Sequence, residues 1–222
     1  MTIRTAGIVC TGVLALAGAG GVLADNGKEK IKFNAADQAA ARTALLRSSD
    51  LGGTGWQGGR IKPDLSSLTC PDYHPKQSDL VLTGAAESYF RRGTAKADVQ
   101  GVDVEVQVLE TARMVALDWR RAVLAPGLLP CLRRSLVSSL GSQAKLISFK
   151  RIAFPRLATY SRAYRAAINA SASGQSERLF TDVIFVGRGR SEVTLTIDGL
   201  TKTAISAADG RLARLVLKRF RV

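Results

Sequence analysis

The sequence GVDVEVQVLETARMVALDWRRAV, from Gly101 to Val123, changes its hydrophobic period once. Over 102–108 valine stands at every second position, which predicts a strand with one face in the core and one in water. After Glu110 the apolar residues recur every three or four positions, which places them on one face of a helix. They are Ala112, Val115, Ala116, Trp119, Ala122 and Val123. That helical face needs a sheet to cover it, so the stretch predicts an α+β domain.

The remaining elements fit a single domain, which we expect to span 34–222. Strands are predicted at 80–92, 144–154, 157–169, 179–186 and 192–198, and a glycine hairpin at 187–190 joins the last two. Helices are predicted at 35–47 after an Asn34 cap, at 130–140, and at the C-terminus after caps at Ser206 and Asp209. No internal repeat indicates a second domain.

The segment GTGWQG, 53–58, has the letters of the dinucleotide-binding pattern G-x-G-x-x-G. That pattern binds a nucleotide only between a strand and the start of a helix. Here it follows a predicted helix, so we interpret it as a turn that carries Trp56 into the core. No cofactor is predicted.

Composition allows one sizeable core. The 222 residues are 46% hydrophobic and 23% charged, unlike a disordered chain or a protein with several membrane spans. The formal net charge of +14 becomes 14 − 1 = +13 without Arg4, the one charged residue of 1–24. Such a charge favours acidic partners. An exported protein rarely meets nucleic acid, and only 6% of the residues are aromatic, so no nucleic-acid partner is expected.

Residues 1–24 have the pattern of a secretory signal peptide. Arg4 precedes a small apolar stretch, and signal peptidase accepts Val22 and Ala24 before its cut. We predict cleavage after Ala24, a flexible lead-in over 25–33, a secreted or extracytoplasmic location, and no transmembrane segment after cleavage. The alternative is a membrane anchor, because the uncleaved segment nearly reaches the ~20 residues of a membrane span.

Cleavage would remove Cys10 and leave Cys70 and Cys131 as the cysteines of the mature chain. An even number of cysteines in an oxidising compartment favours a disulfide. We therefore predict a bond between Cys70 and Cys131, which joins a proline-rich loop over 62–78 to the helix near Pro130. The alternative is two separately buried thiols.

Residues for known catalytic and metal-binding devices are scarce. His74 is the one histidine, no G-x-S-x-G segment presents a serine, and the cysteines lack zinc-site spacing. We predict no metal site and no catalytic residue. Asp103 and Glu105 share a strand face and resemble an acid–base pair, although acids commonly alternate on a solvated face.

Basic residues are dispersed along the chain and are not gathered in one tail. Arg162 shares a predicted strand face with Tyr160 and Tyr164, and a guanidinium beside phenol rings can hold a phosphate or carboxylate. These three residues are the predicted ligand site, for an anionic cell-wall polymer, a lipid or a small amphiphile. The alternative is that the tyrosines pack under a helix and Arg162 covers them.

The residues Leu45-Leu46, Asp50-Leu51 and Trp56 after glycines resemble the opening of a group of actinobacterial secreted domains. These are related to the extracytoplasmic sensor domain of Ser/Thr protein kinases and to mycobacterial periplasmic lipoproteins. The cysteine placement and the order of elements are also similar, although the kinase sensor domain carries two disulfides. The resemblance implies a largely antiparallel sheet flanked by helices, and a ligand-sensing or cell-envelope role without established catalysis.

Two functions are therefore expected. The first is a secreted, non-enzymatic, sensor-like or ligand-binding protein of the cell envelope. The second is an extracellular hydrolase or transferase with a carboxylate site. An apolar cleft with arginines favours the first function, whereas Asp103 or Glu105 at the base of a cleft favours the second.

Overall fold

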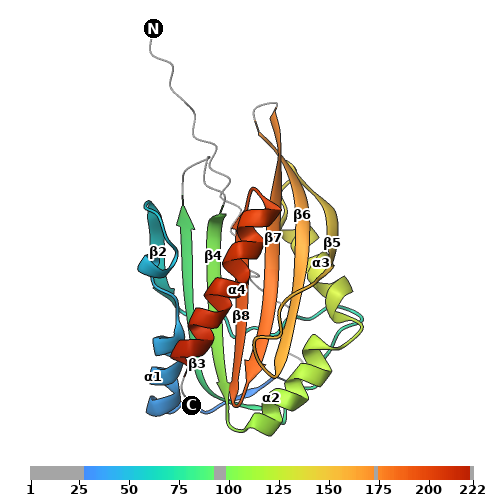
Figure 1. The fold of residues 1–222 in the computed structure, drawn as a ribbon. Helices are drawn as coiled ribbons and strands as arrows, with labels where there is room; N and C mark the ends of the chain where they lie inside the picture. Colours follow the sequence, from blue (N-terminus) through green and yellow to red (C-terminus); the bar gives the residue numbers. More distant parts are fainter. Residues whose placement is uncertain (1–27, 93–98, 173–174, 221–222) are drawn as a thin grey trace.

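The computed structural model describes residues 28–92, 99–172 and 175–220. Its centre is an eight-stranded sheet in the order β1-β3-β4-β8-β7-β6-β5, with β2 paired to β3 (Figure 1). The strands are β1 (Lys30–Ile31), β2 (Trp56–Ile61), β3 (Val81–Arg92), β4 (Val99–Leu109), β5 (Ala144–Ile152), β6 (Tyr160–Ala172), β7 (Gln175–Arg188) and β8 (Ser191–Gly199). All pairs of these strands are antiparallel except β1 with β3. The α+β class with a largely antiparallel sheet is confirmed.

The helices are α1 (Ala35–Ala44), α2 (Ala112–Asp118), α3 (Leu128–Ser139) and α4 (Lys202–Arg219). Two short helical turns accompany them, η1 (Ser48–Asp50) and the π-helical η2 (Trp119–Val123), which continues α2. Within the described residues, no helix is long and apolar enough to cross a membrane. The signal peptide predicted at 1–24 lies outside the described residues.

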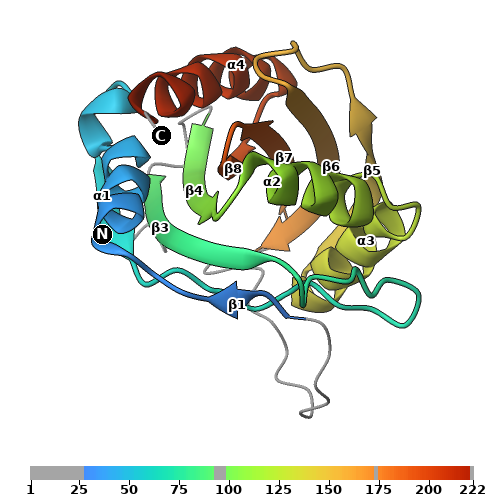
Figure 2. The ribbon, with the colours of Figure 1, turned by 90° about the horizontal axis from the view of Figure 1, so that it is seen from below.

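The front face of the sheet carries the main core. All four valines of 102–108 point to this side and are buried, as their period predicts. They pack with Val193, Leu195 and Ile197 of β8 and with apolar residues of α1 and α4. Figure 2 shows α4 on one side of the strands and α2 and α3 on the other. The back face is thus the side on which α2, η2 and α3 pack, over β5, β6 and β7.

The start of the last helix differs from the prediction. Helix α4 begins at Lys202, and the Thr201 hydroxyl accepts a hydrogen bond from the Ala204 backbone N–H (3.3 Å). Ser206 and Asp209 lie inside the helix, and Asp209 is buried against the sheet. Local sequence offers two capping patterns here, and the longer helix buries Ile205 as well, which decides between them.

Two short strands are absent from the prediction. Lys30–Ile31 pairs with β3 as β1 inside the expected flexible lead-in, and Trp56–Ile61 pairs with β3 as β2. The turn before β2 is confirmed, because Gly52, Gly53 and Gly55 all have positive φ. Trp56 packs partly buried against the main core, and the Arg92 guanidinium lies 4.7 Å from its ring centre.

Replacing Arg219 by alanine is expected to lower the free energy of unfolding by about 1–3 kcal/mol. Arg219 forms two hydrogen bonds with the Asp50 carboxylate (2.6 and 2.7 Å) and one with the Leu45 carbonyl (3.1 Å). These bonds fasten the end of α4 to η1. Urea unfolding measures the loss, and Arg178→Ala at an exposed strand position is the control. Equal midpoints for wild type and Arg219→Ala would contradict this role.

Candidate functional site

A line of acidic side chains occupies the back face of the central strands. Asp103 and Glu105 alternate with the valines of β4, so they share the back face, as predicted. Glu87 of β3 stands directly opposite Glu105. On the other flank of β4, Glu192 and Asp198 of β8 stand opposite Gln107 and Gly101. We name Glu87, Asp103, Glu105, Glu192 and Asp198 the acidic strip.

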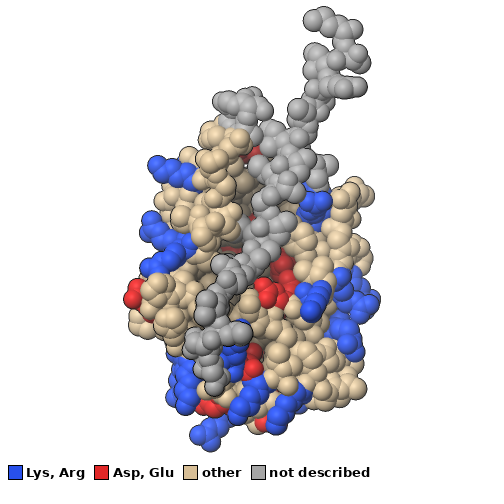
Figure 3. Space-filling model, turned by 180° about the vertical axis from the view of Figure 1, so that it is seen from behind, with Lys and Arg blue, Asp and Glu red and all other residues tan. Residues whose placement is uncertain are grey.

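The acidic strip is accessible. Each of its five residues is partly buried, with neither a fully buried nor a fully exposed side chain. Figure 3 views the back face and shows acidic side chains near its middle and basic side chains toward its margins. A polar ligand can therefore approach carboxyl groups that stand on a rigid sheet.

Burial and crowding raise the pKa of several of these carboxyls. Burial raises the pKa of Glu105 to about 7, against a hydrogen bond from Gln107, and raises that of Asp198 to about 6. Burial and the neighbouring Glu87 raise the pKa of Asp103, whose protonated carboxyl donates a hydrogen bond to Glu87. The strip therefore holds protons near neutral pH unless a cation replaces them.

A second carboxyl pair lies at the end of the acidic strip near α2. Burial raises the pKa of Glu192, and the approach of Asp118 from α2 raises it further. Asp118 accepts a hydrogen bond from Gln77 (2.9 Å), and Glu29 before β1 adds a third acidic group. The Glu192 Oε1 atom is buried and has no hydrogen-bond partner.

An apolar pocket borders the acidic strip on the side of α3. Its lining comes from α3 and four strands, namely Leu132, Leu136, Phe149, Ala166, Thr181, Val183 and Thr196. Thr196 stands opposite Asp103, and the Thr181 hydroxyl donates a hydrogen bond to Asp198 (2.6 Å). Carboxyl groups and an apolar wall are therefore neighbours on one face.

The residues of the predicted ligand site share the back face of β6 and contact helices. Tyr164 is 4% exposed, and Tyr160 stacks on Trp119 of η2 with ring centres 5.2 Å apart. Arg162 donates hydrogen bonds to the Val123 carbonyl (3.1 Å) and to the Tyr164 hydroxyl (3.3 Å). These contacts give the three residues a packing role, as in the alternative. Anion binding by them stays a prediction.

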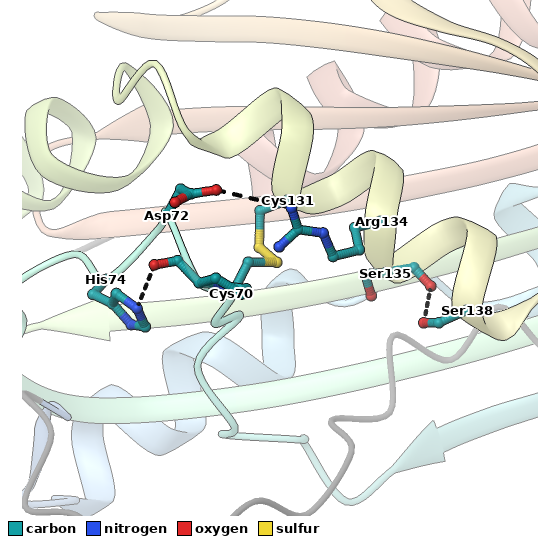
Figure 4. The surroundings of a disulfide bond; sticks show 8 residues. Cys70, Asp72, His74, Cys131, Arg134, Ser135 and Ser138 are labelled. Atoms are coloured by element: carbon teal, nitrogen blue, oxygen red, sulfur yellow. Dashed lines mark hydrogen bonds and ion pairs between the residues drawn. A yellow bond between two sulfur atoms is a disulfide. The ribbon is translucent and has the colours of Figure 1, made fainter.

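Figure 4 shows Cys70 and Cys131 joined in the predicted disulfide, with Cα atoms 5.6 Å apart. The bond fastens the 62–78 loop to α3, beside the buried Tyr73. His74 is exposed on this loop, and its Nε2 lies 3.1 Å from the Pro71 carbonyl oxygen. No catalytic partner of His74 is found among the described residues.

Other arginines that made the chain look suited to anions are held in ion pairs. Arg165 binds Asp182 with two hydrogen bonds, Arg190 binds Asp37, and Arg121 binds Asp79. In the described part of the chain, no group of three or more His, Cys, Asp and Glu residues is arranged to hold a metal ion.

A solved structure resembles this fold. The chain is similar to the crystal structure of the extracellular domain of PknH from Mycobacterium tuberculosis, with 13% sequence identity and a TM-score of 0.46. The match covers 82% of this chain and 95% of that one. No protein-family model matches the chain, and no curated protein matches its sequence.

The sequence analysis identified two members of the acidic strip, Asp103 and Glu105, and missed the other three. A signal for two of them was present, because β8 alternates polar and apolar residues from Glu192 to Asp198 as regularly as β4 does. Glu87 has no such signal, since its neighbours in β3 are mostly buried on both faces.

Proposed function

We propose that this protein is an extracytoplasmic, non-enzymatic, sensor-like protein that binds a small ligand on the back face of its sheet. The observation that carries the proposal is the partly exposed acidic strip beside the apolar pocket. Ligand sites typically combine an apolar wall with a few polar groups that orient the ligand. The disulfide and the signal-peptide pattern support an extracytoplasmic location.

The orientation of the carboxyls favours binding over hydrolysis. Asp103 and Glu105 rise from the same strand and point to the same side. In glycoside hydrolysis, by contrast, two carboxyls flank the scissile bond from different sides. A ligand on the back face would meet both groups from above, as a bound molecule meets the floor of its site.

A ligand screen by thermal unfolding tests the proposed function. A ligand at about 100 times its Kd is expected to raise Tm by roughly 5–10 °C. Thr196→Tyr places a phenol ring beside Asp103 and is expected to abolish this shift, because the ring occupies the border of pocket and strip. Ser176→Tyr, at an exposed position of β7, is the control and is expected to keep the shift. Retention of the shift in Thr196→Tyr would refute the site.

The second candidate is the hydrolase or transferase with a carboxylate site. It is favoured by the pKa of about 7 for Glu105, because a group that gains and loses a proton near neutral pH suits acid–base catalysis. Turnover of a screened compound, with loss of turnover in Glu105→Gln, would establish this candidate in place of the first. Anionic wall polymers and lipids stay candidate partners for the exposed basic residues.

A further inference from the structure

The acidic strip places like charges against one another. Glu87 and Glu105 are directly paired across β3 and β4, and Asp103 lies beside both. Like charges directly opposite in a sheet destabilise it. None of the five residues of the strip forms an ion pair with a lysine or arginine of the described chain. The five carboxyls thus lack a cation within the described protein.

Glu192 gives independent evidence for a missing partner. Its Oε1 atom has less than 1 Å² of exposed surface and no hydrogen-bond donor. A buried acceptor without a partner carries a desolvation cost that a bound donor would remove. The neighbouring Asp118 is 6% exposed, so this end of the strip gathers two carboxyls where water has little access.

The spacing of the carboxyls identifies the shape of the missing cation. One pair, Asp103 with Glu87, lies at the middle of β4, and the other, Glu192 with Asp118, lies beside Gln107. Asp103 and Gln107 are four residues apart on one strand, which corresponds to roughly 13 Å. Within the described residues the carboxyls converge on no single point as metal ligands do. They form a line with an acid pair at two places.

We propose that the ligand of the back face is an elongated organic cation with at least two protonated amines, one held by Asp103 and Glu87 and another by Glu192 and Asp118. This inference rests on the proposed function and names its ligand class. Amines donate hydrogen bonds to carboxylates, and each pair offers several acceptor oxygens. The alkyl stem between the amines lies over Thr194 and Thr196.

The proposal has a pH dependence of known sign. In the free protein the raised pKa values keep protons on Glu105, Asp103 and Glu192 near neutral pH. A bound cation favours the ionised carboxyls, so binding releases protons. Affinity therefore increases as the pH rises from about 6 to about 8, while the amines stay charged. The charged groups near the two pairs are Glu29, Asp64 and Arg121.

Calorimetric titration of the mature chain with spermine, spermidine and butylamine tests the proposal. Spermine and spermidine are expected to bind at least 10-fold more tightly than butylamine. Glu105→Gln and Glu192→Gln are each expected to weaken spermine binding about 10-fold, because each removes a charge-assisted partner. Glu177→Gln, at an exposed position of β7, is the control and is expected to bind as wild type does. Thermal unfolding shows that the variants fold, since removal of a crowded carboxyl does not lower Tm.

Several results would overturn the proposal. They are no spermine binding at millimolar concentration, equal affinities for spermine and butylamine, unchanged affinity in both glutamine variants, or displacement of spermine by equimolar Mg²⁺. The proposed function is judged separately by the ligand screen. A neutral or anionic ligand that loses its thermal shift in Thr196→Tyr would refute the cationic class and keep the binding site.

Discussion

Replacing Cys131 by serine is expected to lower the free energy of unfolding by about 4 kcal/mol. The disulfide closes a loop of 61 positions, and loss of this cross-link frees the unfolded chain by about that amount in the chain-entropy model. In the folded protein the bond holds the 62–78 loop on α3, and Cys131 is 1% exposed. A hydroxyl in its place adds a buried polar group, so the loss is at least that of the cross-link.

Urea unfolding of wild type, reduced wild type and variants measures this effect. Cys70→Ser is the matched control, because Cys70 is partly exposed and its hydroxyl can reach water. It should reproduce the cross-link part of the loss without the burial part, and reduced wild type should resemble it. If Cys131→Ser and oxidised wild type unfold at the same urea concentration, the bond has no part in stability.

Replacing Asp209 by asparagine is expected to stabilise the protein at pH 7 by about 2–4 kcal/mol. Asp209 on α4 is 3% exposed and faces Asp182, which is completely buried on β7. Arg165 makes two hydrogen bonds with Asp182 but stays 3.9 Å from Asp209. Burial and the nearby Asp182 raise the pKa of Asp209, so its carboxyl keeps a proton and donates a hydrogen bond to Asp182.

The sign of the pH dependence follows from proton binding. Above about pH 4 the unfolded Asp209 loses its proton while the folded one keeps it, so stability falls as the pH rises. The slope is up to about 1.4 kcal/mol per pH unit. Asparagine imitates the protonated carboxyl and does not titrate. The advantage of Asp209→Asn is therefore small near pH 4 and grows towards pH 8.

Thermal and urea unfolding between pH 4 and pH 8 measures this difference. Asp182→Asn is the matched control, because it weakens the paired carboxylate that balances Arg165 and is expected to destabilise by about 3–5 kcal/mol. The two asparagine variants of neighbouring carboxyls should thus have opposite effects. A destabilised Asp209→Asn at pH 7 would show that the Asp209 carboxyl is ionised in the folded protein.

Much of the fold was predictable because neighbouring residues encode it. The period of 101–123 predicted β4, its buried valines and the helix after it, and the glycine segment at 187–190 predicted the β7–β8 hairpin. Composition and redox chemistry predicted the pairing of Cys70 with Cys131. The predictions that differ concern strand β1, strand β2 and the start of α4, where the pairing partner or the better cap lies in another part of the chain.

The sequence by itself determined which side chains share a strand or helix face, since the periods of strands and helices follow from backbone geometry. Only the tertiary structure decided which faces meet. It brings Glu87, Asp103 and Glu192 together from three strands, pairs dispersed arginines with buried aspartates, and covers Asp209 with the sheet. The charge of a residue is local, but its pKa and partners depend on burial and on distant neighbours. That is why a chain of net charge +14 has an acidic candidate site that its composition does not predict.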